Sequence, residues 1–453
     1  MEKNHLLTNK QHGFRKKRSC LTQLIDHVDH ILKSLNSGDE VDVIYLDYAK
    51  AFDKVDHKIL LAKLKCYGIT GKMYKWIEEF LTNRVQTVVV EGNKSTFQIV
   101  VSGVPQGTVL GPILFIIYIN DQIDALRSAK GSIFADDTKL TGSIGGEMGG
   151  EHCHTLLQED LWNVIQWSLK NNMELNQEKF EVMIYNLSTT LLQRNLPFTV
   201  MMQQYQVTSG ATINPSNVVR DLGVLLSDDC SWTPHINNMV KDARKMASWV
   251  FSVFRDRSQF LMLTLYKAMV RSKTEYCCPV WNPTRVGDIE AIESVQRNFT
   301  RRIGSCKDLD YWERLKKLKI LSLQRRRERY MILHVWKIVN KMAPNDIKME
   351  FKTHQRLGIK AVIPEFNNKA QRSISTHYEN SFGVKAARLW NLLPKEVNEK
   401  TVLEHFKVVL GEYIDKFPDT PPTKGYAAVN RNSLLEWTLE EDFCRRTHMM
   451  PLS

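Results

Sequence analysis

Two adjacent aspartates, Asp136 and Asp137, lie inside the apolar segment "SIFADDTKL" (132–140), and a third, Asp47, closes "VDVIYLD" (41–47). Carboxylates in apolar surroundings cost free energy unless hydrogen bonds, protons or cations neutralise them. If the two segments are neighbours in one sheet, each carboxylate pair at about 4 Å costs about 4 kcal/mol at an effective dielectric of about 20. Such a cluster either holds protons or binds cations.

Oxygen ligands without a nearby histidine favour Mg²⁺ over zinc or copper. Two such ions about 3.5–4 Å apart bind the attacking and leaving oxygens of a phosphoryl transfer. The acids therefore predict two Mg²⁺, with Mn²⁺ as a possible substitute. Because neighbours in an extended strand face opposite sides, we expect Asp136 to bind metal together with Asp47, and Asp137 to be auxiliary. The alternative is that each acid serves only a turn or a cap.

The apolar pattern indicates the elements that must position these acids. Residues 41–47 are almost continuously apolar, which is typical of a strand buried on both faces. Residues 84–102 predict two strands joined at Gly92-Asn93, and 156–170 has helical spacing. The longest apolar run, 109–119, is shorter than the roughly 20 residues of a membrane span and predicts a buried core helix.

The second half of the chain is mostly helical in pattern, with a domain change near 215–235. The helix expected at 236–254 carries a basic face opposite its apolar face; that basic face contains Lys241, Arg244 and Lys245. The chain has 453 residues and a net charge of +12, of which +8 falls in 313–341. This concentration suggests a polyanion partner, although a solvated helix face is equally consistent with it. The residues expected to bind nucleic acid are Lys316, Lys317, Lys319, Arg325, Arg326 and Arg327.

Length and composition exclude several classes. Hydrophobic residues make up 43% and charged residues 25%, as in an ordinary globular protein of about three domains. The eight cysteines form no CxxC pair, which argues against a disulfide framework or a structural zinc site. The first residues lack the apolar stretch of a secretory signal. We therefore expect an intracellular protein without a membrane partner.

Three motifs resemble those of a known enzyme family: "DVIYLDYAKAFDKVDH", "SGVPQGTVLGPILFIIYIND" and "FADD", in this order and at these separations. They resemble the palm motifs of reverse transcriptases, and most closely those of jockey-like and long-interspersed-element non-LTR retrotransposons. The blocks at 11–24, 175–183 and 220–236 look like flanking blocks of the same enzymes. The resemblance extends to about Tyr426.

The resemblance implies an α+β, right-hand polymerase fold whose palm is an antiparallel sheet with helices. Its expected domains are partial fingers (1–40), palm (41–215), primer-grip hairpin with a helical, basic thumb (216–345), and a C-terminal region with a partly disordered tail (346–453). Only ten residues precede "QHGF", and a fingers segment like "YRPISL" and an endonuclease are missing, so we expect an N-terminally truncated member.

The resemblance also implies roles for single residues. Asp47, Asp136 and Asp137 are the expected metal ligands, and the backbone carbonyl of Tyr48 can also reach a metal. Phe52 matches the aromatic steric gate that leaves no room for a ribose 2′-hydroxyl.

Further residues match nucleotide-binding positions. Gln106 matches the residue that lies against the incoming nucleotide, and Gly107 lets the backbone come close. Lys179 matches the lysine that protonates or stabilises the leaving pyrophosphate. Arg15 lies in the fingers block and could approach the triphosphate.

The implied function is that of an RNA-directed DNA polymerase. Its partners would be an RNA template, a DNA primer or target and deoxynucleoside triphosphates, and its location the cytoplasm and nucleus. Two alternatives remain open on the sequence alone. One is a catalytically impaired retrotransposon remnant that only binds RNA or DNA. The other is a polymerase that makes RNA, which the bulk of Phe52 disfavours.

Overall fold

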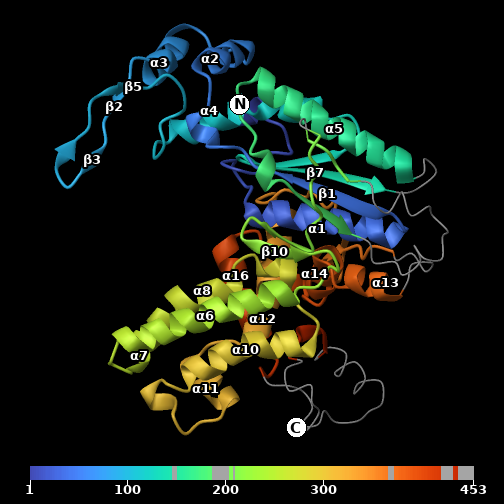
Figure 1. Ribbon diagram of the computed structural model, residues 1–453. Coiled ribbons are helices and arrows are strands. Elements are labelled where there is room, and N and C mark those ends of the chain that lie inside the picture. Colours follow the sequence, from blue (N-terminus) through green and yellow to red (C-terminus); the bar gives the residue numbers. More distant parts are fainter. Residues whose placement is uncertain (145–149, 186–203, 208–209, 366–371, 420–431, 437–453) are drawn as a thin grey trace. The chain divides into compact units, whose positions relative to one another are not determined.

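The computed structural model divides into two compact units (Figure 1). The first unit contains Met1–Gln23 and Ser37–Val219, and the second contains Leu24–Asn36 and Arg220–Ser453. Helices combine with antiparallel sheets, so the predicted α+β class is confirmed. The residues that the structure describes are 1–144, 150–185, 204–207, 210–365, 372–419 and 432–436.

A four-stranded antiparallel sheet in the order β6-β7-β1-β8 forms the centre of the first unit. Its strands are β1 (Glu40–Leu46), β6 (Lys130–Phe134), β7 (Asp137–Ile144) and β8 (Glu181–Tyr185). Strand β1 lies between β7 and β8, and its Val41, Val43 and Ile44 are fully buried. The central, buried strand predicted from the apolar run is thereby confirmed.

Helices cover this sheet and complete the core. Helix α5 (Gly150–Lys170) packs on β7, and its apolar residues share a core cluster with Ile44 and Leu140. A Cβ at Gly142 of β7 would lie 2.9 Å from a Leu157 methyl, so glycine permits this close approach. The other helices of this unit are α2 (His57–Cys66), α3 (Gly71–Leu81) and α4 (Leu110–Tyr118). The apolar run at 109–119 is the buried helix α4, as predicted.

Residues 84–102 form the predicted hairpin, which projects from the first unit as a narrow ribbon (Figure 1). Its tip pairs Val90 with Asn93, so the turn consists of Glu91 and Gly92, both with positive φ. The turn therefore lies one residue before the predicted Gly-Asn pair, in the primed geometry that suits a two-residue hairpin. Its strands are β2 (Val85–Gln86), β3 (Val89–Val90), β4 (Asn93–Lys94) and β5 (Gln98–Ile99).

The second unit is mainly helical, as the pattern after residue 237 predicts. Helix α12 packs against α9, α10 and α14. The helices are α6 (Thr233–Val253), α7 (Gln259–Leu265), α8 (Ser272–Glu275), α9 (Cys278–Trp281), α10 (Val286–Thr300), α11 (Tyr311–Leu318), α12 (Leu323–Val339), α13 (Arg372–Glu379), α14 (Phe382–Asn391), α15 (Lys395–Asn398) and α16 (Leu403–Ile414). Helix α1 (Cys20–Ser37) contributes residues to both units.

Two small antiparallel pairs complete this part of the chain. Strands β9 (Val218–Asp221) and β10 (Val224–Ser227) form a hairpin at the start of the range 216–345, where one is expected, and β11 (Phe351–His354) pairs with β12 (Gly358–Ala361). From Arg220 onward, the ranges expected as thumb and as C-terminal region fall in the same compact unit, and their domain names stay predictions. The expected disordered tail lies mostly outside the described residues.

Candidate active site

Asp47 and Asp136 meet at one end of the central sheet. Asp47 directly follows β1, and Asp136 lies in the two-residue turn between β6 and β7. Strands β1 and β7 are antiparallel neighbours, with Leu46 opposite Thr138, so both acids come to the same edge. Burial raises the pKa of the Asp136 carboxyl, and the negative charge of Asp47 raises it further. The predicted adjacency of the two strands is confirmed.

Asp137 occupies a different position from Asp136. It opens β7 opposite Phe134 and is exposed to solvent. Within the part of the chain that the structure describes, no three His, Cys, Asp or Glu side chains gather into a group that could hold a metal ion. The structure therefore brings Asp47 and Asp136 together and does not group Asp137, the first residue of β7, with them. A metal-binding role for Asp137 stays a prediction.

Lys179 lies beside the aspartate pair although 132 residues separate it from Asp47. It ends the short 3₁₀ helix Gln177–Lys179, which leads into β8, the neighbour of β1. Its Nζ is 3.2 Å from Oδ2 of Asp47. The preceding backbone is held in place because the Asn176 N–H donates to the Asp47 carbonyl (2.9 Å). An ammonium thus stands next to the carboxylate expected to bind metal.

The Tyr48 side chain anchors the backbone on the other side of Asp47. Tyr48 is 4% exposed, and its hydroxyl accepts a hydrogen bond from Nε2 of Gln122 (2.6 Å). Oε1 of the same glutamine accepts from the Thr138 hydroxyl (3.3 Å). Burial raises the pKa of the Tyr48 hydroxyl far above its usual range, so it stays neutral. Gln122 therefore connects the end of β1 to the start of β7.

Phe52 is held rigidly between two other aromatic rings. It stacks on Phe115 of α4 with ring centroids 4.2 Å apart and an interplanar angle of 17°. Phe14 meets it edge-on, at 6.0 Å and 82°. Such aromatic pairs each contribute about 0.5–1.5 kcal/mol beyond the area that they bury. The ring therefore forms a fixed wall, as a steric gate requires.

The loop that carries Gln106 and Gly107 runs along the segment after Phe52. The Val104 N–H donates to the Phe52 carbonyl (2.9 Å), and Nε2 of Gln106 donates to Oδ1 of Asp53 (2.9 Å). Gly107 has φ +76° with open space around it, so its backbone is accessible. The structure thus brings the expected gate and the expected nucleotide-binding loop together. Sequence reasoning missed Asp53, because no local pattern marks a contact across 53 residues.

The Arg15 side chain is held by contacts within the chain. Its Nε and Nη2 lie 3.0 and 2.7 Å from the two carboxylate oxygens of Glu2, and Nη1 donates to the Thr8 carbonyl. Only 7% of its side chain is exposed. Its charge is neutralised within the chain, so the expected approach to a triphosphate would require this pair to open.

In the positively charged segment 313–341, called the basic window below, the three arginines expected to bind nucleic acid contact groups of the protein instead, which corrects that expectation. Arg325 and Arg327 are 0% and 1% exposed. Nε of Arg325 donates to the Asn432 carbonyl (2.7 Å), and Nε of Arg327 to Oδ1 of Asn282 (3.0 Å). Three consecutive residues point about 100° apart around a helix, so they cannot all face solvent on a helix as enclosed as α12.

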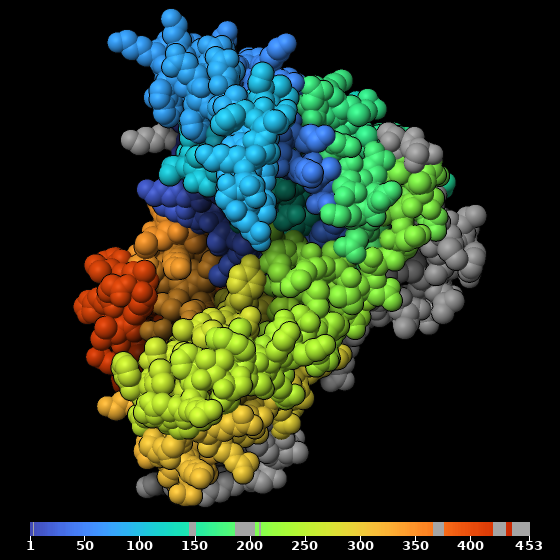
Figure 2. Space-filling model, turned by 60° about the vertical axis from the view of Figure 1, so that its left-hand side comes forward, coloured from blue at the N-terminus to red at the C-terminus, as the bar shows by residue number. Residues whose placement is uncertain are grey.

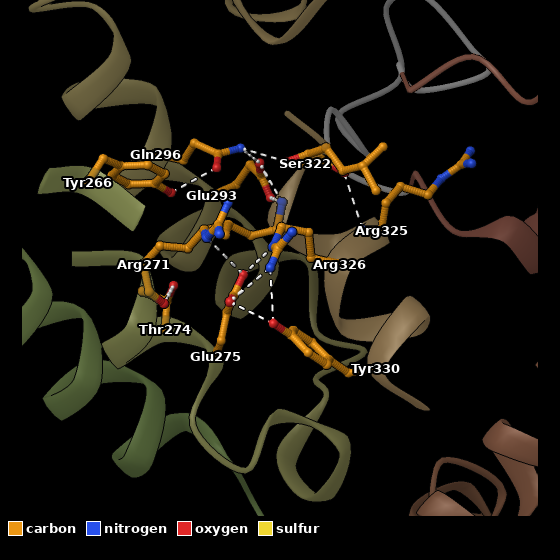
Figure 3. Close-up of polar contacts among 12 residues, drawn as sticks. Tyr266, Arg271, Thr274, Glu275, Glu293, Gln296, Ser322, Arg325, Arg326 and Tyr330 are labelled. Carbon is orange, nitrogen blue, oxygen red and sulfur yellow. Dashed lines mark hydrogen bonds and ion pairs between the residues drawn. The ribbon is translucent and has the colours of Figure 1, made fainter. Parts of the chain in front are cut away.

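Arg326 is also engaged inside the second unit. Its guanidinium forms a forked ion pair with Glu275, whose carboxylate accepts a further hydrogen bond from the Tyr330 hydroxyl at 3.0 Å (Figure 3). The neighbouring Glu293 is buried and accepts from the Leu323 N–H at the start of α12 (3.1 Å). By contrast, the lysines of the same window are exposed on and after α11: Lys316, Lys317 and Lys319.

Comparisons with known proteins agree with the motifs. Residues 1–224 match the family "Reverse transcriptase (RNA-dependent DNA polymerase)". The chain is 26% identical over 313 residues to the probable RNA-directed DNA polymerase from transposon X-element of Drosophila melanogaster, covering 68% of this chain and 33% of that protein. It is 26% identical over 308 residues to the RNA-directed DNA polymerase from mobile element jockey of Drosophila funebris, covering 65% and 32%.

A solved telomerase from Candida albicans, in complex with a fragment of telomeric RNA, has 12% identity and a TM-score of 0.39, covering 71% of this chain and 51% of that one. The chain spans about a third of the length of the curated relatives that it matches. Across the described ranges, no helix combines the length and the apolar character that a membrane span requires. Residues 1–224 therefore belong to the reverse transcriptase family, and the similarity to transposon polymerases supports the non-LTR retrotransposon type that the motifs indicate.

Proposed function

We propose that this chain is the polymerase part of an RNA-directed DNA polymerase, which extends a DNA primer with deoxynucleotides along an RNA template. The observation that supports this most is the pairing of Asp47 and Asp136 on neighbouring strand ends, with Lys179 3.2 Å from Asp47. Two carboxylates that raise each other's cost of ionisation are tolerated where a cation neutralises them.

The donor set suits a hard divalent cation. Asp47 and Asp136 offer carboxylate oxygens only, which is the ligand type that Mg²⁺ prefers, and few protein ligands leave positions for substrate phosphates. We propose two Mg²⁺ here, for which Mn²⁺ can substitute. When bound, they would act as Lewis acids at the phosphoryl group and at the primer hydroxyl.

The protein's own groups would complete the chemistry. Lys179 would donate a proton to the leaving pyrophosphate, which general-acid catalysis makes worth about 10²–10⁴-fold in rate. Gln106 would lie against the incoming nucleotide. Phe52, held between Phe115 and Phe14, would exclude a ribose 2′-hydroxyl and so select deoxynucleotides.

The second unit offers exposed cations for a nucleic-acid backbone. On α6, whose part of the chain is drawn in yellow-green in Figure 2, basic side chains and the half-exposed Trp249 are open to solvent. Exposed lysines and arginines bind phosphates by releasing counterions, and an exposed ring can stack on a base. We propose that these residues contact the template and primer, in the cytoplasm and the nucleus: Lys241, Arg244, Lys245, Lys316, Lys317 and Lys319.

Primer extension tests the proposal directly. The assay supplies an RNA template, a DNA primer, Mg²⁺ and deoxynucleotides, and compares the parent chain with Asp136→Asn. The matched control is Asp124→Asn, an exposed acid of the same unit. We expect template-dependent DNA from the parent and the control, and none from Asp136→Asn. Absence of product from the parent, or equal product from Asp136→Asn, would refute the proposal.

A further inference from the structure

The segment Lys10–Gly13 runs beside the turn that carries Asp136. The His12 N–H donates to the Ile133 carbonyl (2.8 Å), and the Ile133 N–H donates to the Lys10 carbonyl (3.0 Å). Gln11 thereby forms a parallel bridge with Ile133 of β6. A stretch from the start of the chain thus continues the hydrogen bonding of the β6–β7 hairpin, 124 residues away from its turn.

Gln11 bonds both backbone groups of the residue before Asp136. Its Oε1 accepts from the N–H of Ala135 (2.9 Å) and from the N–H of Gly13 (2.7 Å), and its Nε2 donates to the Ala135 carbonyl (3.4 Å). The side chain is 1% exposed. A buried carboxamide therefore does for Ala135 what a neighbouring strand would do, satisfying its donor and its acceptor.

Ala135 needs such support because its backbone is unusual. Its φ is +56°, in the left-handed region that costs a residue with a Cβ about 1 kcal/mol or more. Such a conformation persists when the surroundings determine it. The close approach also depends on Gly13, since a Cβ at that position would lie 2.4 Å from the Ala135 nitrogen. Gln11 and Gly13 therefore fix the backbone conformation of Ala135, which leads into Asp136.

We propose that Gln11 is a positioning residue that holds the Asp136 carboxylate in the geometry for binding the divalent cation. This inference rests on the proposed function, in which Asp136 is a metal ligand. Residues that orient a ligand through a hydrogen bond typically change metal affinity or activity by about 10–100-fold when replaced. A glutamine that served only the core would change stability and leave metal affinity as it was.

The test compares Gln11→Ala with a matched glutamine of helix α1 that contacts the same strand, β6. Gln23 is fully buried, and its Nε2 donates to the Ser132 hydroxyl of β6 (3.0 Å), away from the turn. Free Mn²⁺ is measured by electron paramagnetic resonance in titrations of each full-length chain, and hydrogen exchange is followed in the peptide containing Ile133 to Asp136. We expect about 10-fold weaker Mn²⁺ binding and faster exchange in Gln11→Ala, and neither change in Gln23→Ala.

Mn²⁺ affinity within about two-fold of the parent in a folded Gln11→Ala chain would overturn the inference. Should that variant not fold, Gln11→Met decides by the same criterion, because it keeps the length and the neutral charge of the side chain and removes only the carboxamide. Both measurements need no nucleotide, so they judge Gln11 separately from synthesis. Failure of the parent to make DNA would count against the proposed function alone.

Discussion

Replacing Lys179 by methionine should reduce synthesis strongly while leaving the fold almost unchanged. Its Nζ lies 3.2 Å from Oδ2 of Asp47, and the two side chains are 67% and 37% exposed. Ion pairs this exposed typically contribute about 0.2–1 kcal/mol to stability. Loss of a general acid costs about 10²–10⁴-fold in rate, which corresponds to about 3–5 kcal/mol at the transition state.

The assay is single-turnover primer extension at saturating deoxynucleotide, together with urea unfolding of each chain. Lys54→Met is the matched control, because Lys54 forms a similar exposed pair with Glu174 at 3.0 Å. Lys179→Arg separates the two roles of the charge: it keeps the cation, but an arginine does not give up its proton. We expect slow extension by both Lys179 variants and normal extension by Lys54→Met. A loss under about 10-fold in Lys179→Met, or an equal loss in the control, would refute the assignment.

Four other changes address the gate, an arginine and the lysines of the basic window, and a buried acid. Phe52→Ala should lower the preference for deoxynucleotides over ribonucleotides by about 10-fold or more, measured as the ratio of kcat/KM values; an unchanged ratio would contradict a gate. Arg326→Met should destabilise the second unit by about 1.5–3 kcal/mol without weakening RNA binding, because Glu275 loses its forked partner and keeps only Arg271 at 3.4 Å and the Tyr330 hydroxyl. Glutamines at Lys316, Lys317 and Lys319 should instead lower the salt slope of RNA binding by about 2–3. Burial raises the pKa of Asp42 to about 6, so the folded chain holds this proton more tightly than the unfolded chain does. The unfolding free energy of the parent, relative to that of Asp42→Asn, should therefore fall by up to about 3 kcal/mol between about pH 4 and pH 6. If urea unfolding gives the same free-energy difference between the two chains at both pH values, the prediction is wrong.

The strands that carry the acids could be predicted because their sequences leave few alternatives. A run such as "VDVIYL" is too apolar for an edge strand and too short for a helix, and it forms the central β1. The pairing of β1 with β7 is not a local property of either sequence. It was expected because Asp47 follows β1 and Asp136 precedes β7, and the two acids can bind the same cations only if these strands are neighbours. Pattern and chemistry together therefore predicted where Asp47 and Asp136 meet.

The residues that support the acids could not be predicted in this way. Gln122 contacts Tyr48 across 74 residues, and Gln11 contacts Ala135 across 124. A glutamine in a helix or a loop has no periodicity that distinguishes a buried clamp from a solvated side chain. Its role depends on which backbone groups the fold leaves without partners, and only the three-dimensional arrangement determines those.

The expectation that the arginines of the basic window bind nucleic acid was wrong for a related reason. Counting charges measures how many cations a segment holds, but not whether they face water. Arginine combines a long apolar stem with a planar set of donors, so Arg325 and Arg327 can be buried once carbonyl and amide groups from Asn432 and Asn282 meet them. Lysine carries a compact, strongly hydrated charge, and the lysines at 316, 317 and 319 remain exposed.

Exposure to solvent separates two kinds of polar residue in the chain. Asp47, Lys179 and Gln106 are at least partly exposed, so they contribute little to the free energy of folding and are available to substrate. Arg326 and Glu293 lie in hydrogen-bond networks within the second unit, where losing one partner leaves a mostly buried charge with fewer partners. Variants of the first kind should fold and fail at synthesis, and variants of the second kind should have a lower free energy of unfolding. Gln11 is buried but adjoins Asp136, so it should affect both, and the metal affinity of its variants distinguishes positioning from packing.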